Sequence, residues 1–587
     1  MENLIPLLLC DYYKLVHNKL YDPRICRLVS YYTPRSSRLP LGPNQKVIMF
    51  GLQGFIKEYL IDNFNKYFFN KDIDEIINEL KEFLDETFES DDSFLSKVKA
   101  LHSLGHIPLQ IRAIPEGCKA VIGTPMIEIS TTHPEFPWIG EFIESMISSY
   151  IWKPMIDANV AHWYREIVNK YYDETVEDSV PRNTAMSEFG FRGADSPESG
   201  IHSGAAWLTS FKSTATCGAI KFIEKYYNES IKGRNIGGGL RSTEHSIMCS
   251  SYALDGDEET FIRNLLTKLT PTGNISMVSD SYDYWNVITN ILPKLKNEIL
   301  GRDGTLFVRG DSGDPIKIVS GYIDLTDSLG LNDENSLTTG DILQVTSEII
   351  LDGENGDYDI TSIDTEDYCC VHDSEGRYYR IEYSDQLNKY RVGKEIPSHE
   401  AKGTVEVLYD LFGGYDNSKG YIVLNDYIRA IYGDSITHRR ARMIYSILMC
   451  KGFAANNVAL GAGSFSFHAY ESNEGRLYPY TRDSYGSAIK ATYCEWKDEN
   501  GKIHELGFCK DPKTNDNTDV IKKSMKGCCL IRKSSDTEDP FYYLDHDGLT
   551  YTESMNESEL ETVFIDGLLI KETSLNEIRD RLYQGKF

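Results

Sequence analysis

Short apolar runs alternate with longer amphipathic stretches through the middle of the chain. The runs end in small or acidic residues and cover positions 274–280, 305–311, 427–434 and 457–463. Runs of this length without an alternating polar face are typical of strands buried on both sides, as in a parallel sheet or an α/β barrel. Stretches with helical spacing lie at 138–172, 205–227 and 440–451. The alternation therefore predicts an α/β barrel built on a parallel sheet.

The two ends of the chain follow another pattern. Near the start, a mainly helical stretch at 73–100 is mixed with short apolar runs. Near the end, Asn500-Gly501 and Asp547-Gly548 each follow a strand-like run, and both dipeptides favour hairpin turns. We therefore expect a mixed first region and a hairpin-rich last region outside the barrel.

Residues 318–402 interrupt the barrel pattern. They contain 19 Asp or Glu and 6 Lys or Arg, a net charge of −13 out of −28 for the whole chain. That much charge cannot be buried unpaired, so a surface position is predicted. Strand-like runs at 368–371 and 378–383 flank a turn, which predicts a hairpin in a small acidic β-rich insertion. The expected domain limits are 1–145 (first part of a flanking α+β domain), 146–317 and 403–476 (barrel), 318–402 (insertion) and 477–587 (C-terminal β-rich part).

Composition narrows the class of protein. Hydrophobic residues make up 41% and charged residues 26% of the 587, as in ordinary globular proteins. The acidic charge disfavours nucleic acid as a partner, because proteins that bind the phosphate backbone are usually basic. No apolar run approaches the roughly 18 residues of a membrane helix, and the apolar start with Glu2 is interpreted as part of the fold rather than a targeting segment. Twelve scattered cysteines without a C-x-x-C predict reduced thiols in a cytoplasmic protein.

Acidic residues end three of the predicted strands: Asp280, Asp311 and Asp434. A barrel enzyme has its active site at the carboxyl ends of its strands. One such Asp could merely terminate a strand, but three in one domain favour a site. Arg309 begins the stretch Arg-Gly-Asp-Ser-Gly-Asp, whose backbone and serine suit phosphate or ribose oxygens and whose guanidinium can bind an anion in a fork.

Other candidates are less specific. Gly461-Ala-Gly-Ser464 after a strand suits a phosphate loop or a plain tight turn equally well. His245 has Glu244 beside it and a phosphate site nearby, which favours a functional histidine over a structural one. Basic residues in a chain this acidic fit either an anionic small molecule or a solvated face; they are Arg482, Lys490, Lys510, Lys522 and Lys523.

Ten segments in order along nearly the whole chain resemble the nicotinamide phosphoribosyltransferase family, with the insertion as the exception. They are Asp11–Lys14, Phe50–Gln53, Ile114–Gly117, Glu188–Gly193, Glu244–Ser246, Val278–Asp283, Val308–Gly313, Tyr432–Asp434, Thr481–Asp483 and Phe508–Pro512. The resemblance implies an irregular type II phosphoribosyltransferase α/β barrel and a flanking β-rich domain built from both chain ends. It also implies a homodimer whose active sites lie at the subunit interface.

The implied reaction joins nicotinamide to 5-phosphoribosyl 1-diphosphate, giving nicotinamide mononucleotide and diphosphate in NAD salvage. By resemblance, Phe189 and the partner subunit's Tyr13 sandwich the ring, with Asp11 from the same subunit as Tyr13 and with Arg309 beside the ring. The residues that would contact the phosphoribosyl and diphosphate groups are Arg192, His245, Arg309, Gly310, Asp311, Gly433, Asp434, Gly463, Ser464, Arg482, Lys490, Lys510 and Lys522. Mg²⁺ is the implied cofactor.

His245 matches the family's phosphorylatable histidine, so the resemblance implies that ATP can form phosphohistidine there. Glu244 and Asp280 are expected to orient the imidazole, and together with His245 and Asp311 they form the expected catalytic group.

One position departs from the family. Ala215 stands where the family has an Asp that accepts the amide N–H of nicotinamide and repels nicotinate. Base selectivity is therefore open, and two alternatives keep the fold: nicotinate as the base, or a bulkier ribosyl diphosphate donor such as an ADP-ribose diphosphate. A non-catalytic binding protein is a third hypothesis, opposed by the retained diphosphate-binding residues.

Overall fold

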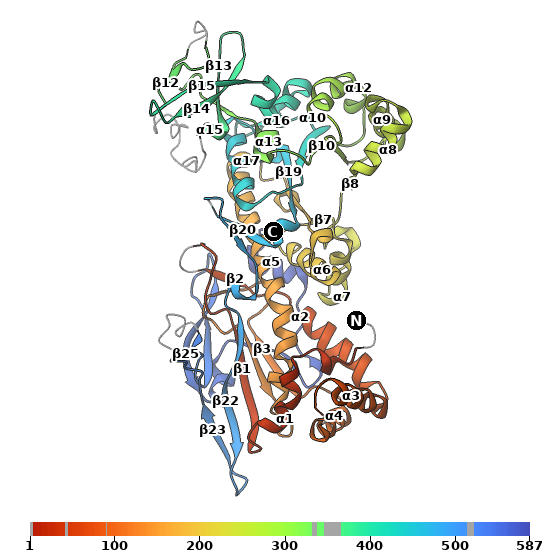
Figure 1. Ribbon diagram of the computed structural model, residues 1–587, viewed down its shortest axis with the longest axis vertical. Coiled ribbons are helices and arrows are strands. Elements are labelled where there is room, and N and C mark those ends of the chain that lie inside the picture. Colours follow the sequence, from red (N-terminus) through yellow and green to blue (C-terminus); the bar gives the residue numbers. More distant parts are fainter. Residues whose placement is uncertain are drawn as a thin grey trace.

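The computed structural model describes residues 4–41, 45–89, 91–331, 337–345, 365–472, 474–513 and 522–587. The molecule is elongated (Figure 1). A β-rich domain occupies one end, the barrel lies in the middle and towards the other end, and the insertion projects beside the barrel.

Seven parallel strands form the sheet of the barrel. In spatial order they are β7 (Ser213–Thr214), β6 (Met186–Phe189), β19 (Val458–Gly463), β18 (Ile428–Tyr432), β10 (Leu306–Gly310), β9 (Ile275–Val278) and β8 (Arg241–Ser242). A bridge between Ser213 and Gly238, just before β8, brings the two edges of the sheet together. The predicted barrel is confirmed, and the four apolar runs are its strands β9, β10, β18 and β19.

Helices cover this sheet. The predicted helices at 138–172 and 440–451 are α5 (Ile139–Thr175) and α17 (His438–Cys450). The prediction of a single helix over 205–227 is wrong. Helix α6 (Pro197–Trp207) ends, β7 enters the sheet, and α7 (Cys217–Tyr226) begins after it. The two-residue strand is polar and too short to produce an apolar run in the sequence. No helix in the described residues has the length and apolar composition needed to cross a bilayer.

Both chain ends build the flanking domain, as predicted. Its larger sheet has the order β23 (Ile503–Gly507), β22 (Ala488–Lys497), β1 (Ile25–Thr33), β5 (Ile127–Thr131), β3 (Leu109–Ala113), β26 (Glu561–Ile565) and β27 (Leu568–Leu569). The smaller sheet has the order β2 (Lys46–Ile48), β4 (Lys119–Val121), β25 (Phe541–Leu549) and β24 (Cys528–Lys533). In the larger sheet, β1 from the first region pairs antiparallel with β22 from the last, with Val29 opposite Tyr493.

Only one of the two predicted hairpin turns is present in the structure. Asn500-Gly501 connects β22 to β23, as expected. Asp547-Gly548 instead lies inside β25, where the register against β24 shifts between Cys528 and Cys529. Gly548 has φ +97°, so the dipeptide forms a β-bulge there. A bulge and a hairpin turn both need a residue with positive φ, and the sequence alone does not separate them.

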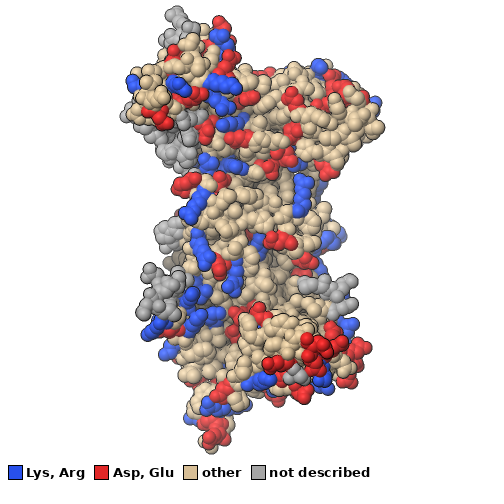
Figure 2. Space-filling view, viewed as in Figure 1, with Lys and Arg blue, Asp and Glu red and all other residues tan. Residues whose placement is uncertain are grey.

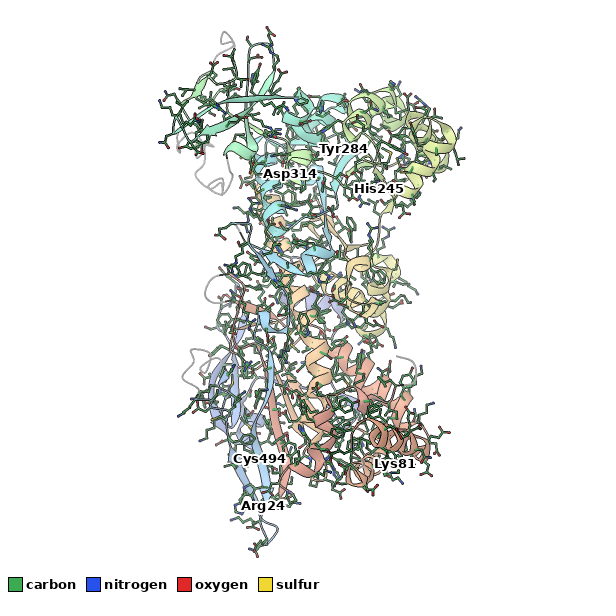
Figure 3. The ribbon with its side chains drawn as sticks, viewed as in Figure 1. Arg24, Lys81, His245, Tyr284, Asp314 and Cys494 are labelled. Carbon is green, nitrogen blue, oxygen red and sulfur yellow. The ribbon has the colours of Figure 1, made fainter. Side chains whose placement is uncertain are left out.

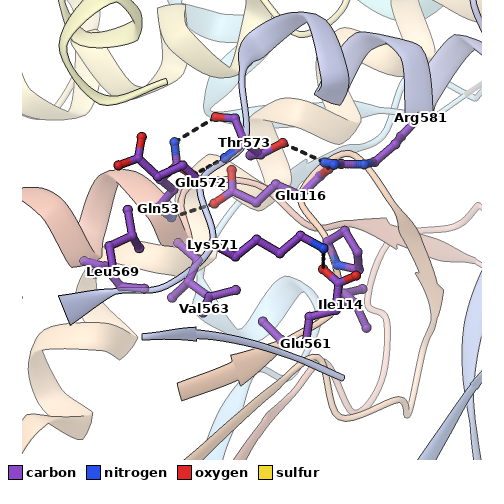
Figure 4. A pocket seen from close by; sticks show the side chains of 14 residues that line it. Gln53, Ile114, Glu116, Glu561, Val563, Leu569, Lys571, Glu572, Thr573 and Arg581 are labelled. Atoms are coloured by element: carbon purple, nitrogen blue, oxygen red, sulfur yellow. Dashed lines mark hydrogen bonds and ion pairs between the residues drawn. The ribbon is translucent and has the colours of Figure 1, made fainter. Parts of the chain in front are cut away.

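A hydrogen-bonded joint connects the flanking domain to the barrel (Figure 4). The buried side chain of Gln53 donates to the carbonyl oxygens of Tyr226 in α7 and of Thr573, at 2.6 and 2.9 Å. The backbone N–H of Thr573 donates back to Gln53 at 2.7 Å. Arg581, in α20 (Leu575–Tyr583), donates to the carbonyl of Glu116 at 2.8 Å. These bonds hold the last segment of the chain against both domains.

The insertion contains a sheet of its own. Its order is β11 (Ile323–Asp324), β13 (Cys369–His372), β14 (Tyr378–Ser384), β15 (Lys389–Ile396) and β12 (Ile342–Leu343), which includes the predicted hairpin. A separate core fills it, made of Leu325, Leu337, Leu343, Cys369, Val371, Tyr379, Ile381 and Val392. Figure 2 shows acidic and basic side chains interspersed over its visible face. Residues 332–336 and 346–364 of the predicted insertion lie outside the described residues.

The predicted insertion limits of 318 and 402 are too wide. Residues 318–320 belong to α13 (Pro315–Ser320), and 398–402 belong to α16 (Ser398–Phe412), both of which pack on the barrel. The predicted limit at residue 145 falls inside α5. The remaining limits stay predictions.

Deleting 323–396, with a short Gly-Ser bridge, should leave the remaining protein folded. The cut ends are close, because Tyr322 N–H donates to the Ala401 carbonyl at 2.8 Å, and changes in loop length cost little. We expect a Tm within about 5 °C of the parent and an unchanged association state by sedimentation. Deleting 318–402 is the matched control. It removes half of α13 and the carbonyl of Ile318 that accepts from Thr404 at 2.6 Å, and it should fail to fold. Aggregation of the narrow deletion would show that the insertion supports the barrel.

Candidate active site

The carboxyl ends of the barrel strands bring most of the predicted site residues together. Parallel strands end at one edge of their sheet, and β6, β19, β18, β10 and β9 end here. Residues at or just after these ends are Phe189, Gly463, Ser464, Gly433, Asp434, Arg309, Gly310, Asp311 and Asp280. In Figure 3, His245 lies beside this part of the barrel, remote from Arg24 and Cys494 in the flanking domain.

The ring of Phe189 packs closely against two glycines. A Cβ at Gly433 would stand 2.8 Å from the ring, and one at Gly461 would overlap it. The guanidinium carbon of Arg309 is 5.7 Å from the centre of the same ring. Only glycine permits such close approach of a ring to two neighbouring strands. The strand ends therefore hold one aromatic face and one cation side by side.

Arg309 is fixed by one bond and leaves another donor open. Its Nη2 donates to Asp311 at 2.9 Å, while Nε is buried without a partner in the structure. The backbone N–H of Asp311 donates to Oδ2 of Asp280 at 3.1 Å, and Oδ1 of Asp280 is buried and unpartnered as well. Buried polar atoms without partners are costly, so these two suit a bound molecule. Among the described residues, no group of three or more His, Cys, Asp or Glu gathers as a metal site.

His245 begins α8 (His245–Asp255) and has neighbours that the sequence did not indicate. Its Nδ1 lies 3.0 Å from Oγ of Ser281 and its Nε2 lies 3.7 Å from Asp311. Glu244 instead accepts from the Ser246 hydroxyl, and Asp280 accepts from the backbone of Asp311. In this geometry His245 therefore contacts Ser281 and Asp311, and the orienting role of Glu244 and Asp280 stays a prediction. With 48% of its side chain exposed, the imidazole is open to solvent and to ligands.

The loop after β19 contacts the loop after β6. The side chain of Ser464 fills the space beside Gly193, where a Cβ would overlap it. Gly193 ends the short 3₁₀ helix Phe191–Gly193, which also carries the exposed Arg192. After β18, the exposed Asp434 accepts a hydrogen bond from the Ser435 hydroxyl at 3.0 Å. Arg192, Ser464 and Asp434 thus lie on loops around the strand ends.

Ala215 lies directly after β7, beside a buried carboxylate. Its backbone N–H donates to the carbonyl of Glu188 at 2.9 Å. The hydroxyls of Thr214 and Thr216 donate to the carboxylate of Glu188 at 2.7 and 3.1 Å. Burial raises the pKa of Glu188, and these donors lower it in part. The substituted position is therefore flanked by two threonines that bind one acidic group.

Comparison with known proteins identifies the family. The profile described as the nicotinate phosphoribosyltransferase (NAPRTase) family matches residues 184–525. The chain belongs to this family. It is 32% identical to the nicotinamide phosphoribosyltransferase of Acinetobacter baylyi, over 99% of this chain and 97% of that protein. It is 25% identical to the nicotinamide phosphoribosyltransferase of Xanthomonas campestris pv. campestris, over 99% and 98%. The crystal structure of human nicotinic acid phosphoribosyltransferase has 13% identity and a TM-score of 0.43, over 98% of this chain and 93% of that one.

The remaining predicted residues of this nicotinate phosphoribosyltransferase family member belong to the flanking domain. Asp11, Tyr13, Glu144 and Arg482 line a hollow of about 260 Å³ on the flanking domain, and no strand-end residue lines it. Asp11 accepts from Ser145 and from the Tyr13 hydroxyl, and these bonds help to lower its pKa.

Lys490 belongs to the same surface. It lies 3.8 Å from Glu144, and burial lowers its pKa. Lys510 is exposed, with its backbone paired to Ser524, and Lys522 is exposed directly after the undescribed residues 514–521.

Sequence reasoning missed two residues of this site. Ser281 follows Asp280 inside a segment already singled out, and Glu188 begins another. Their positions in the motifs were the only signal. The roles of the Ser281 hydroxyl and the Glu188 carboxylate become visible only when their partners, which are distant in sequence, are known.

Proposed function

We propose that the protein is a nicotinamide phosphoribosyltransferase of NAD salvage, which converts nicotinamide and 5-phosphoribosyl 1-diphosphate into nicotinamide mononucleotide and diphosphate. The observation that carries the proposal is the pairing of Phe189 with Arg309 at the strand ends, which offers one face for a flat ring and one cation for an anion. The names of the relatives from Acinetobacter and Xanthomonas support the same substrates.

The reaction breaks the bond between ribose C1 and the diphosphate oxygen while the pyridine nitrogen forms the new bond to C1. Negative charge grows on the leaving diphosphate, so fixed cations and N–H donors lower the barrier. Arg309 offers its unpartnered Nε–H for this role, with Arg192 in the short helix after β6 and His245 at the start of α8. Phe189 holds the ring in line with C1, which turns a bimolecular encounter into a positioned attack.

Mg²⁺ fits this site through carboxylate oxygens. Mg²⁺ is commonly bound by one or two carboxylates together with substrate phosphates, and when bound it would neutralise diphosphate charge. The free Oδ1 of Asp280 and the neighbouring Asp311 are the candidate ligands.

We infer a homodimer in which the surface around Asp11, Tyr13, Arg482 and Lys490 completes the partner's site. Two observations support this arrangement: Tyr13 is 56% exposed, and the cations Arg482 and Lys490 lie on the same surface. A cytoplasmic location fits the twelve cysteines, all of which lie in the described residues and outside any disulfide.

One assay tests the activity. Purified protein with Mg²⁺ and 5-phosphoribosyl 1-diphosphate receives nicotinamide or nicotinate in parallel, and the products are identified by mass. Nicotinamide mononucleotide is the expected product. Formation of the nicotinate product alone, or turnover only with an ADP-ribose diphosphate donor, would replace the proposal with one of its alternatives. Absence of every product would favour a binding protein.

His245→Ala should remove any stimulation by ATP and leave Mg²⁺-dependent transfer. The exposed imidazole lies beside Asp311 and can accept a phosphoryl group, whereas Ala cannot. Ser281→Ala is the matched control. It removes the hydroxyl at Nδ1 and keeps the imidazole, so partial stimulation should remain. The measurement is the initial rate with and without ATP. Equal stimulation of His245→Ala and wild type would exclude a phosphohistidine at this position.

A further inference from the structure

Glu188 is a fully buried carboxylate at the edge of the base site. It precedes Phe189 in β6, and its exposed fraction is 0%. An ionisable group is seldom buried so completely without a function or a dedicated set of partners. No described ion pair involves Glu188. The neighbouring buried carboxylate Asp157, in contrast, pairs with Lys153 at 2.6 Å.

The partners of this carboxylate come from two segments of the chain, one at β7 and one directly after β6. Thr214 and Thr216, on either side of Ala215, donate to its two oxygens at 2.7 and 3.1 Å. The backbone N–H of Gly190 donates to it as well. Three donors converging on one carboxylate favour its ionised form and oppose the effect of burial, which raises the pKa of Glu188. Glu188 therefore connects the end of β6, which carries Phe189, to the segment that carries Ala215.

The strand register shows which way these side chains point. Ser187 pairs with Ser213 and Glu188 pairs with Thr214. The hydroxyls of Ser187 and Ser213 meet at 3.0 Å on one face of the sheet, while Glu188 and Thr214 meet on the other. Because side chains alternate, Phe189 and Ala215 share the first face. The carboxylate thus lies behind the ring-binding face, across one thickness of backbone.

We propose that Glu188 is the positioning and selectivity residue of the base site, supplying from behind the sheet the fixed negative charge that Ala215 lacks. The inference rests on the proposed function. A charge held in the interior acts through low dielectric, so it disfavours anionic nicotinate and leaves neutral nicotinamide unaffected. The same three hydrogen bonds keep Phe189 and Ala215 at a fixed separation.

The test compares Glu188→Gln, which is isosteric and neutral, with Glu188→Asp, which is shorter and charged. Two quantities are measured for each base: kcat/KM for transfer, and the dissociation constant by calorimetry with Mg²⁺ and diphosphate. Glu188→Gln should raise relative use of nicotinate about 10-fold or more, with KM for the phosphoribosyl donor unchanged. Glu188→Asp should keep the wild-type preference and lose turnover. Adding Ala215→Asp to Glu188→Gln should restore the preference for the amide.

Glu128→Gln controls for a purely structural effect. Glu128 is equally buried and pairs with Arg112 at 3.1 Å in the flanking domain, so its variant should lower Tm without changing the preference between bases. If Glu188→Gln lowers Tm and leaves both preference and base affinities unchanged, the proposal is overturned. If wild type transfers neither base but its base affinities shift with Glu188→Gln as expected, the proposed function fails and the role of Glu188 stands. Binding of neither base to wild type would overturn both.

Discussion

Arg309→Ala should lower kcat/KM by roughly 100- to 1000-fold, the range seen when one donor to a developing negative charge is removed. Arg309 faces the ring of Phe189, is held by Asp311, and keeps a buried Nε–H for the substrate. Its loss removes a charge-assisted donor from a closed site and leaves Asp311 without its cation. Both kcat and the KM for the donor should change.

Two variants show that the effect belongs to this guanidinium. Lys522→Ala removes an exposed, solvent-screened cation and should cost less than about 5-fold. Arg309→Lys keeps the charge without the planar fork and should fall between wild type and Arg309→Ala. Steady-state kinetics with both substrates varied gives the comparison. Comparable losses for Arg309→Ala and Lys522→Ala would mean that Arg309 does not contact the reacting groups.

Ala215→Asp should shift preference towards nicotinamide by about 1–3 kcal/mol, or roughly 5- to 150-fold in the ratio of kcat/KM values. The new carboxylate can accept the amide N–H and repel nicotinate. Wild type should still use nicotinamide, since the ring contact of Phe189 does not distinguish an amide from an acid. It should reject nicotinate less strongly than an enzyme with Asp at this position.

Competition between the two bases, for wild type and Ala215→Asp, measures this shift. Ala215→Asn is the matched control, because it keeps the size and hydrogen-bonding capacity but not the charge. It should reproduce only part of the shift. If wild type already rejects nicotinate strongly and Ala215→Asp changes nothing, then a group other than residue 215 distinguishes the amide from the acid.

Part of the barrel was predictable because no residue of β9, β10, β18 or β19 is exposed. Their runs in the sequence, such as 275–278 and 306–310, are mainly apolar and lack an alternating polar face, which is typical of such strands. The two-residue β7 carries no such signal, and Gly548 fits a turn as well as the bulge that it forms. Local pattern therefore identified the long buried strands, and pairing in three dimensions decided the short or ambiguous ones.

The candidate site divides in the same way. Its strand-end residues could be predicted, since Asp280, Asp311 and Asp434 follow recognisable strands. Which partner each side chain has could not, because the partners come from other elements. Ser281 rather than Glu244 meets the imidazole, and Thr214 and Thr216 bind Glu188 from another strand. Hydrogen bonds between segments far apart in sequence leave no local signature.

Helix α5 contacts both the surface around Asp11 and a loop at the carboxyl ends of the barrel strands. Near its start, Ser145 binds Asp11, and Glu141 and Glu144 bind Lys14. Twenty residues further on, Tyr164 donates to the carbonyl of Ile436 in the loop after β18, at 2.6 Å.

The number of residues in the helix therefore sets the distance and the rotation between these two groups of contacts. One added residue between these contacts would move the surface around Asp11 by about 1.5 Å and turn it by about 100° relative to the strand-end loop. Added or removed residues in this family member should thus be tolerated in the insertion and should disrupt the site when they fall along α5.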